Sequence, residues 1–400
     1  MKIFVIGAGV SGLALGSFLE NQDITIIERN EIAGRKLLAT GNGRCNFTNL
    51  NLKKENYHGR KENFQTNALE NFSNKDLLTY FEKLGIEWTS LPSGRCYPKT
   101  MSSKTVRDIL YLRARDNAKF IFNEKIVKID LDKKLIISEK NKYRYDILVL
   151  ATGGVSLKNS GSDGSIFKIL ENKVKIEDIS YGITNYKTFE KIDKTAKGVK
   201  VNARADLFID NKKVISSTDD IIFQSYGLTG TAILDLSNYI SKGLQKKKNI
   251  RVDIDFYPEY EHNKLLARLA NIHKAYPKRN AREILLGLVN EKLIIDIEKR
   301  ARIKKGQRKI NIEDLKKLTQ ILKKFSFTIK DIYDKTNAQV TLGGFSTCFI
   351  NNKTMESKKY KGLYFIGETM DVAGDCGGYN IQWAFSSAKA CADDIRSKNV

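Results

Sequence analysis

Three glycines, Gly7, Gly9 and Gly12, form the pattern GxGxxG between an apolar run and a helical pattern. Such a turn lets the backbone approach a pyrophosphate, and the following helix offers unpaired N–H groups and the positive end of its dipole. Glu28 ends the next apolar run, where a carboxylate can accept hydrogen bonds from both ribose hydroxyls and would repel a 2′-phosphate. The sequence therefore predicts binding of an adenine dinucleotide, FAD or NAD rather than NADP. A glycine turn that serves only packing is the alternative.

The segment GRKLLATGNGRCNFTN at 34–49 helps to distinguish FAD from NAD. It brings basic residues and glycines close to the expected pyrophosphate, where an NAD-dependent dehydrogenase would usually continue with regular βα units. Two later apolar runs, YDILVLATGG and GLYFIGE, would bring Thr152, Gly153 and Glu368 to the same edge, with Glu368 placed for a ribityl hydroxyl. The sequence holds no second GxGxxG with a downstream acid. We therefore predict FAD, with NAD(P)H as a transient reductant or oxygen as the second partner.

The elements that position these residues follow from hydrophobic periodicity. Residues 2–30 read as strand, glycine turn, helix and strand, and residues 117–150 as three short strands of a meander followed by a return to the parallel sheet. Asn280 and Asn311 read as N-caps, the first opening one helix through REILLGLVNEKLIIDI and the second a helix through LKKLTQILKK.

A change in residue composition and hydrophobic pattern along the chain indicates inserted domains. We predict an α/β protein with a Rossmann-like FAD domain at 1–185 and 340–400, a β-rich insert at 186–258 and 326–339, and a helical insert at 259–325. The apolar runs are much shorter than the ~20 residues of a membrane helix. The N-terminal run leads directly into glycines rather than into a signal-peptide cleavage site, so we expect a cytoplasmic protein without a membrane segment.

Cysteine usage and charge limit the remaining function classes. Five widely spaced cysteines without a CxxC pair argue against a disulfide framework or a dithiol redox centre, and we expect no metal site. The formal net charge is +23, and residues 242–324 hold 23 Lys or Arg against 10 Asp or Glu. A compositional bias with solvated helix faces is the interpretation we favour. The alternative is a surface for RNA, although Tyr257, Tyr260 and Tyr276 form no ordered array of stacking residues.

Several longer stretches resemble a family of bacterial flavoproteins, the BaiN-like or aminoacetone oxidase-like NAD(P)/FAD-dependent proteins. These stretches are GAGVSGLALG at 7–16, GRKLLATGNGRCNFTN at 34–49, YPKTMSSKTVRDIL at 97–110, LVLATGG at 148–154, TMESKKYKGLYFIGETMDVAGDCGGYNIQWAFSSA at 354–388 and, more weakly, GLTGTAILDLS at 227–237. The resemblance covers essentially the whole chain. It implies a Rossmann-like FAD domain, discontinuous in sequence, that carries an inserted β-barrel-like domain and a helical domain.

The same resemblance implies how the FAD-binding residues are used. Arg35 and Lys36 would lie along the dinucleotide, residues 43–46 near the flavin, residues 377–382 at a helix start by its pyrimidine edge, and Val127 on adenine. The residues expected to contact FAD are then Gly7, Gly9, Val10, Ser11, Gly12, Glu28, Arg29, Arg35, Lys36, Gly43, Arg44, Cys45, Asn46, Val127, Ala151, Thr152, Gly153, Gly154, Gly367, Glu368, Gly377, Gly378, Tyr379, Asn380, Ile381 and Gln382.

Three residues are candidates for acid–base or nucleophilic chemistry. Cys45 could form an adduct or protonate a substrate, but we favour a close-packing role because no neighbouring base is evident in the sequence. His58 could act as a base, and an exposed loop histidine is the interpretation we favour. Tyr379 could face the flavin.

The predicted function is an FAD-dependent oxidoreductase that transfers hydride between a small organic substrate and flavin N5. The substrate is expected to enter between the FAD domain and the inserts. A flavin-dependent RNA-modifying or RNA-binding protein that uses the basic region 242–324 is the alternative.

Overall fold

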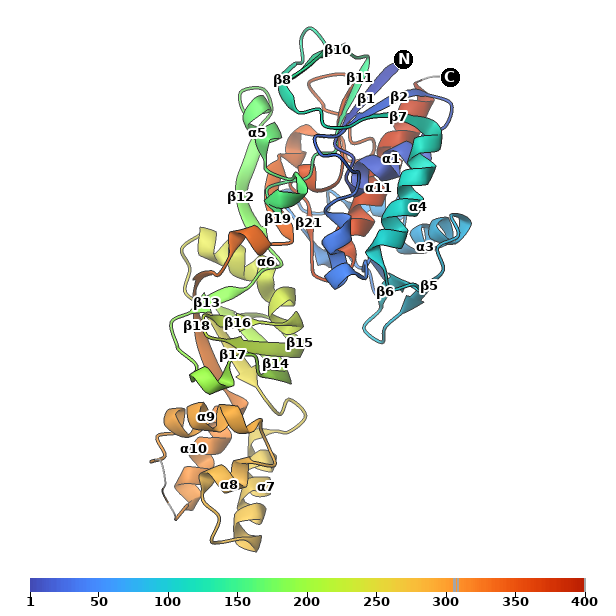
Figure 1. The fold of residues 1–400 in the computed structure, drawn as a ribbon. Coiled ribbons are helices and arrows are strands. Elements are labelled where there is room, and N and C mark those ends of the chain that lie inside the picture. Colours follow the sequence, from blue (N-terminus) through green and yellow to red (C-terminus); the bar gives the residue numbers. More distant parts are fainter. Residues whose placement is uncertain (305–306, 308, 399–400) are drawn as a thin grey trace. The chain divides into compact units, whose positions relative to one another are not determined.

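The computed structural model describes residues 1–304, 307 and 309–398. The chain divides into two compact units (Figure 1). Unit 1 comprises Met1–Gly182 and Thr336–Val400, and unit 2 comprises Ile183–Lys335. Within the described part of the chain, none of the helices combines the length and apolar character needed to span a membrane.

A five-stranded parallel sheet forms the centre of unit 1, in the order β20-β11-β1-β2-β7. Its strands are β20 (Leu363–Phe365), β11 (Ile147–Leu150), β1 (Lys2–Ile6), β2 (Asp23–Ile27) and β7 (Ala118–Ile121). The runs KIFVI, DITII and ILVL are rich in β-branched residues, as expected of strands covered on both faces. The predicted strand, glycine turn, helix and strand at the N-terminus are confirmed.

Three long helices pack together beside this sheet. They are α1 (Val10–Phe18), α4 (Ser103–Asn117) and α11 (Tyr379–Ser397), and α1 contacts both α4 and α11. Phe18 of α1 packs edge to face on Phe385 of α11, with ring centroids 6.2 Å apart. The C-terminal helix is therefore part of the same core as the N-terminal βαβ unit, although more than 350 residues of chain lie between them.

The predicted meander differs from the observed one by one strand. β7 pairs in parallel with β2 and so belongs to the main sheet, whereas the meander consists of β8 (Ile126–Asp130), β9 (Leu135–Ser138) and β10 (Lys142–Arg144). AKFIFN at 118–123, the first of the three predicted meander strands, was wrongly assigned because local alternation does not reveal a strand's partner.

Smaller elements complete unit 1. The remaining helices are α2 (Thr66–Asn71), α3 (Asn74–Lys83) and α5 (Ser165–Leu170), and the remaining strand groups are β3 (Thr48–Asn49) with β6 (Arg95–Pro98) and β5 (Trp88–Ser90), β4 (Tyr57–His58) with β21 (Ala373–Gly374), and β12 (Ile176–Gly182) with β19 (Val340–Phe345). The β3 and β4 pairings place the chain that follows Gly43 in short strands rather than in free loops.

Unit 2 contains a closed six-stranded barrel in the order β13-β16-β15-β14-β17-β18. Its strands are β13 (Tyr186–Thr188), β16 (Gly227–Thr229), β15 (Lys212–Gln224), β14 (Lys200–Ile209), β17 (Ile250–Asp255) and β18 (Phe325–Ile332), and helix α6 (Thr231–Gln245) packs on β15. Phe223, Phe325 and Phe327 are fully buried in its interior. The barrel-like insert implied by the resemblance is confirmed.

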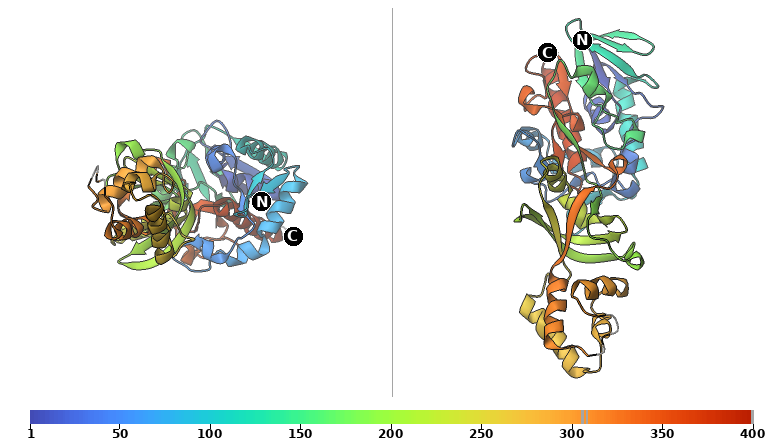
Figure 2. Two further views of the ribbon diagram at one scale, coloured as in Figure 1. Left: turned by 90° about the horizontal axis from the view of Figure 1, so that it is seen from below. Right: turned by 90° about the vertical axis from the view of Figure 1, so that its left-hand side faces the viewer.

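A group of helices joins β17 to β18 (Figures 1 and 2). They are α7 (His262–Ala275), α8 (Ala281–Leu285), α9 (Ile294–Arg300) and α10 (Ile312–Lys323). Arg300 joins them to the barrel, because its guanidinium lies 3.8 Å from the ring centroid of Phe325 and donates to the carbonyl oxygen of Ser326.

Both predicted N-caps are present, but only one of the two predicted helices has the expected length. Asn280 caps α8 through the amide of Glu283, but that helix ends at Leu285, so the single helix predicted through LLGLVNEKLIIDI was wrong. The chain turns at Asn290 and begins α9 only at Ile294. Asn311 caps α10 as predicted, since its Oδ1 accepts from the amide of Asp314 at 2.9 Å.

The Asn311 cap yields a stability prediction. Asn311→Ala should lower the free energy of unfolding by about 1 kcal/mol, because the amide of Asp314 loses its acceptor. Urea unfolding followed by circular dichroism measures this change. Asn311→Ser restores an acceptor and serves as the control; an alanine variant as stable as the serine variant would contradict the assignment.

Candidate functional site

The GxGxxG turn lies between β1 and α1, and its glycines have different surroundings. Gly7 has φ +103°, and a Cβ at Gly12 would stand 2.0 Å from the carbonyl oxygen of Gly7, so the turn and the helix are in direct backbone contact. A Cβ at Gly9, the N-cap of α1, would meet only the carbonyl oxygen of Ala151, at 3.9 Å, among the described residues. Gly12 therefore serves packing, whereas Gly9 has space above it.

The N-terminus of α1 suits an anion. Its first turn carries no acidic residue, and no side chain of the described residues caps it. The unpaired N–H groups and the positive end of the helix dipole are therefore available to a phosphate. The space above Gly9 lies at this same helix end, which is the arrangement expected of a dinucleotide site.

Glu28 is buried directly beyond β2 and is held beside the glycine turn. Its Oε2 accepts from the amide of Ala8 at 2.8 Å, and its Oε1 accepts from the amide and the side chain of Asn30 at 2.9 and 2.7 Å. These bonds fix the carboxylate at the end of the strand. A ribose contact from Glu28 stays a prediction.

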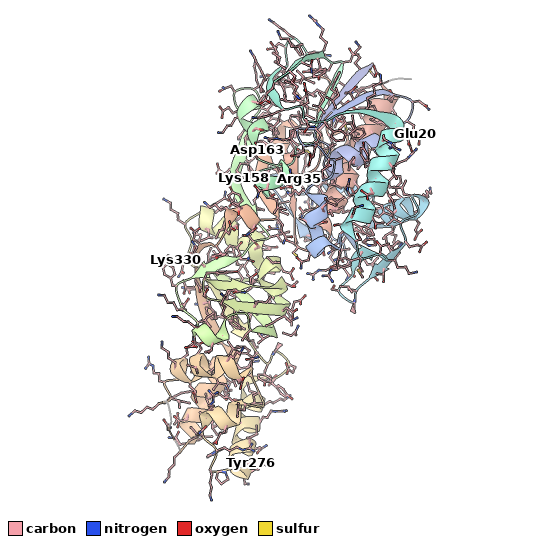
Figure 3. The ribbon with its side chains drawn as sticks, in the orientation of Figure 1. Glu20, Arg35, Lys158, Asp163, Tyr276 and Lys330 are labelled. Carbon is pink, nitrogen blue, oxygen red and sulfur yellow. The ribbon has the colours of Figure 1, made fainter. Side chains whose placement is uncertain are left out.

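The two arginines of this region make different contacts. Arg29 forms an ion pair of 2.6 Å with Asp163, and Arg35 donates to the side-chain oxygen of Asn30 at 3.3 Å (Figure 3). Partial burial favours a higher pKa for Asp163, but hydrogen bonds from Arg29 and Ser165 outweigh it and lower the pKa to about 2. Arg29 is thus held in place by a carboxylate, while Arg35 remains more exposed.

Lys36 and Glu368, predicted separately as cofactor contacts, are partners of each other. The Nζ of Lys36 lies 2.5 Å from Oε2 of Glu368 and donates to the hydroxyl of Ser156 at 2.7 Å. The other carboxylate oxygen accepts from Ser156 and from the amide of Thr341, both at 2.8 Å. Ser156 and Thr341 were not predicted, although each lies within two residues of a glycine motif, LATGG or TLGG.

The ends of β11 and β20 also meet the glycine turn. A Cβ at Gly7 would stand 2.6 Å from the carbonyl oxygen of Ala151, and one at Gly367 would stand 1.9 Å from the hydroxyl of Ser11. The amide of Gly153 donates to Thr369 at 3.2 Å. The predicted gathering of these strand ends at one edge is therefore observed.

The GRCN and GGYNIQ segments lie together although more than 300 residues separate them. Asn49 donates to the carbonyl oxygen of Gly377 at 3.1 Å, and Thr48 donates to Gln382 at 2.6 Å. The side-chain amide of Asn46 bridges the same segments, accepting from the amide of Gly378 at 3.3 Å. Asn46 and Gln382 are therefore joined to the fold by their own hydrogen bonds.

The glycines at this junction differ in the space around them. Gly43 has φ +82° and no described atom within 4 Å of an added Cβ. Gly377 and Gly378 have φ +136° and +97° and lead into α11, whose N-terminal end carries no side-chain cap among the described residues. The first segment thus provides open backbone at Gly43, and the second provides a positive helix end, with Gly378 packed against the backbone of Thr48.

The remaining predicted contact residues are distributed around these segments. Val127 is exposed on β8, Arg44 lies 5.3 Å from the ring centroid of Tyr97, and Asn380 exchanges hydrogen bonds with the backbone of Gly374. Val10, Thr152, Gly154 and Ile381 lie at the start of α1, after β11 and in the first turn of α11. Contact of any of these residues with FAD stays a prediction.

Cys45 is fully buried, with a positive φ of 62°. Burial raises the pKa of its thiol to about 12, against a smaller opposing effect of a hydrogen bond with Thr40. The thiolate is therefore almost absent near neutral pH, which supports the close-packing role.

Tyr379 is also buried, and its carbonyl oxygen accepts from the hydroxyl of Tyr57 at 3.0 Å.

The preferred interpretation of His58 as an exposed loop residue was wrong. His58 lies in β4, paired with Ala373 of β21, and its Nε2 is 2.6 Å from Oδ1 of Asp375. The side chain is only 11% exposed. The carboxylate partner is far away in the sequence, so no local pattern around NYHGR could have revealed it.

No metal cluster accompanies these groups. In residues 1–304, 307 and 309–398, no set of three or more His, Cys, Asp or Glu side chains is arranged to hold a metal ion. The site consists instead of glycine turns, two helix N-termini and a small number of paired charges.

The chain is similar to known proteins over nearly its whole length. A family model described as HI0933-like protein Rossmann domain matches residues 1–394. The chain is 29% identical over 396 residues to a 3-dehydro-bile acid delta(4,6)-reductase of Clostridium scindens, which covers 96% of this chain and 97% of that protein. It is 28% identical over 400 residues to a ribosomal RNA dihydrouridine synthase of Escherichia coli, at 98% and 97% coverage.

Two solved structures are similar to this chain at low sequence identity. A flavocytochrome c3 fumarate reductase is 14% identical, covers 99% of this chain and 78% of its own, and has a TM-score of 0.46. A 3-ketosteroid-delta4-(5alpha)-dehydrogenase of Rhodococcus jostii is 11% identical, covers 98% and 95%, and has a TM-score of 0.44. The curated relatives agree with the predicted oxidoreductase class.

The different surroundings of Gly9 and Gly12 yield a paired prediction. Gly12→Ala should lower the free energy of unfolding of the cofactor-free protein by about 2–3 kcal/mol, because its methyl group overlaps the carbonyl oxygen of Gly7. Gly9→Ala should leave that stability within about 0.5 kcal/mol. It should still weaken FAD binding about tenfold, since its methyl group would enter the space above the α1 N-terminus.

Thermal unfolding and FAD titration separate the two effects. Each variant acts as the control for the other, since both add one methyl group to the same turn. A Gly9→Ala protein that binds FAD as tightly as the wild type would contradict the placement of the dinucleotide.

The raised pKa of Cys45 predicts selective thiol chemistry. Iodoacetamide at mildly alkaline pH should label exposed Cys348 in the folded protein and leave Cys45 unmodified until the protein is unfolded. Peptide mass mapping before and after urea measures this difference. Rapid labelling of Cys45 in the folded state would instead support the hypothesis that it acts as a nucleophile.

Proposed function

Since the chain belongs to the HI0933-like protein Rossmann domain family, we propose that it is an FAD-dependent reductase that saturates a carbon–carbon double bond of its substrate. The observation that carries the FAD part of this proposal is the uncapped N-terminus of α1, with space above Gly9 and the buried carboxylate of Glu28 beside the same turn. The double-bond chemistry is supported by the relatives. These features fit the pyrophosphate and ribose of a dinucleotide.

The residues that would hold FAD belong to three segments of unit 1. The glycine turn would take the pyrophosphate, the accessible backbone at Gly43 would face the ring, and the start of α11 would lie at the ring's far edge. When bound, FAD supplies the redox chemistry through its N5 position. The positive end of the α11 dipole would stabilise negative charge on the ring.

Saturation of a double bond also requires a proton. Hydride joins one carbon, and a proton joins the neighbouring carbon. The buried Cys45 thiol is a poor proton donor because of its raised pKa. The His58–Asp375 pair and Tyr379 are the better candidates in the chain, and their roles stay predictions.

The names of the two relatives support reduction of a double bond but differ in substrate. A bile acid delta(4,6)-reductase acts on a small unsaturated molecule, and a dihydrouridine synthase saturates uracil in ribosomal RNA. We propose RNA as the substrate of this chain, because the match to the ribosomal RNA dihydrouridine synthase spans 98% of this chain. The net charge of +23, which the sequence alone led us to interpret as a compositional bias, also suits a polyanionic partner. A small unsaturated ketone is the second candidate, supported by the similarity to the bile acid reductase.

The proposal predicts a protein that binds FAD and is reduced by a nicotinamide. We expect the purified protein to be yellow, and NADH or NADPH to bleach its visible flavin absorbance under anaerobic conditions. Reoxidation should then be faster with uridine-containing RNA than with buffer alone, and the RNA should gain the mass of two hydrogens per modified uridine. An unsaturated ketosteroid is tested in parallel.

The outcomes separate the parts of the proposal. A colourless protein that cannot be loaded with FAD would refute the reductase. Reoxidation by the ketosteroid and not by RNA would replace the RNA substrate with the second candidate. Reoxidation only by oxygen, with release of peroxide, would make the protein an oxidase.

A further inference from the structure

One face of α7, together with the turn that follows it, is exposed and strongly basic. We call it the α7 surface, and it consists of Tyr260, Lys264, Arg268, Asn271, Lys274, Tyr276, Lys278 and Arg279. Glu261 is the only carboxylate in the sequence between Tyr260 and Arg282. Nothing in the proposed FAD site uses these residues, since they all belong to unit 2.

The helix periodicity explains why this face remains free. Leu265 and Leu269 are fully buried on the side of α7 that packs against α10. Lys264, Arg268 and Asn271 follow at intervals of four and three residues and so share one solvent-facing side next to the buried one. An open groove of about 530 Å³ follows this side and is lined by Tyr260, Lys264, Ala267, Arg268, Asn271 and Ile272.

The guanidinium groups of two arginines lie over the rings of two tyrosines on the α7 surface. The guanidinium of Arg268 lies 5.6 Å from the ring centroid of Tyr260 and donates to its hydroxyl at 3.0 Å. The guanidinium of Arg279 lies 3.9 Å from the ring centroid of Tyr276, which is 53% exposed (Figure 3). Flat aromatic and guanidinium groups of this kind stack on unpaired nucleobases.

The cations of the α7 surface also lack acidic neighbours. Within the described ranges, no carboxylate lies within 4.0 Å of the charged nitrogens of Lys264, Arg268, Lys274, Lys278 or Arg279. Other exposed lysines of unit 2 do have carboxylate partners, as Lys316 has Glu313 and Lys200 has Asp220. The surface therefore keeps a local positive charge that a polyanion can neutralise.

We propose that the α7 surface docks RNA, with its lysines and arginines on phosphates and Tyr276 stacked on an unpaired base. This inference rests on the proposed RNA substrate and adds the place where that RNA binds. An anionic membrane fits the surface less well, because Leu265 and Leu269 are buried and Ile272 is the one large aliphatic residue in the groove lining, which is too little apolar surface for insertion.

Binding of a uridine-containing RNA hairpin to the full-length, FAD-loaded protein tests the proposal. Fluorescence anisotropy over a series of KCl concentrations gives the affinity and its salt dependence. The combined change Lys264→Glu, Arg268→Glu and Arg279→Glu should weaken binding at least about tenfold and reduce the slope of log K against log salt by about 2, since about 0.7 is lost per phosphate contact. Tyr276→Ala should weaken binding about fivefold or more with little change in slope.

A matched variant controls for net charge and folding. Lys75→Glu, Arg115→Glu and Lys119→Glu remove the same charge from exposed positions of unit 1 that form no ion pair with the described residues, and should leave RNA binding close to that of the wild type. Tyr276→Phe should retain binding. Reduction of an artificial dye by NAD(P)H should be equal in all variants, which verifies that FAD and unit 1 are intact.

Each possible result either supports or overturns the proposal that the α7 surface binds RNA. Selective loss in the α7 variant supports it, even if the wild-type protein binds RNA without reducing it, in which case only the proposed substrate fails. Equal loss in the unit 1 control, unchanged binding in the α7 variant, or no RNA binding at low salt would overturn it. Stronger capture by phosphatidylserine vesicles than by RNA would also overturn it.

Discussion

The backbone contact between Gly12 and the carbonyl oxygen of Gly7 is the constraint on which the rest of unit 1 depends. An added Cβ would come within 2.0 Å of that oxygen, so α1 lies directly against the end of β1. This contact fixes the N-terminus of α1 at the edge where β11 and β20 also end. Glu28, held through the amide of Ala8, completes the arrangement.

The C-terminal segment makes this edge into a complete site. α11 packs on α1, and its first turn is joined to the chain after Gly43 through Asn46, Thr48 and Asn49. Two positive helix ends therefore lie within one unit, one with space above Gly9 and one behind two glycines of positive φ. Backbone groups, more than charged side chains, define the part of the site that an anionic cofactor would meet.

Charge is used in two different ways in the molecule. In unit 1, cations near the site are held by specific carboxylates, as Lys36 is by Glu368 and Arg29 by Asp163, so they contribute orientation as well as charge. On the α7 surface of unit 2, cations stand free of carboxylates and lie beside the partly buried Tyr260 and the exposed Tyr276. The first arrangement suits a single ligand in a fixed pose, whereas the second suits a long, flexible polyanion.

The sequence by itself determined the features that depend on short-range geometry. The βαβ unit with Gly7, Gly9, Gly12 and Glu28 and the cap at Asn311 follow from spacing and helix or strand periodicity, which act within a few turns of chain. The resemblance to the flavoprotein family also implied the barrel-like insert, and the observed closed barrel confirms it.

Only the tertiary structure decided which distant residues become partners. The pairing of Lys36 with Glu368 and of His58 with Asp375 joins residues more than 300 positions apart, and the place of β7 in the parallel sheet depends on its contact with β2. A local pattern reports how a segment buries its apolar side chains. The pattern does not indicate which other segment will pack against this one, because the partner depends on the packing of the whole core.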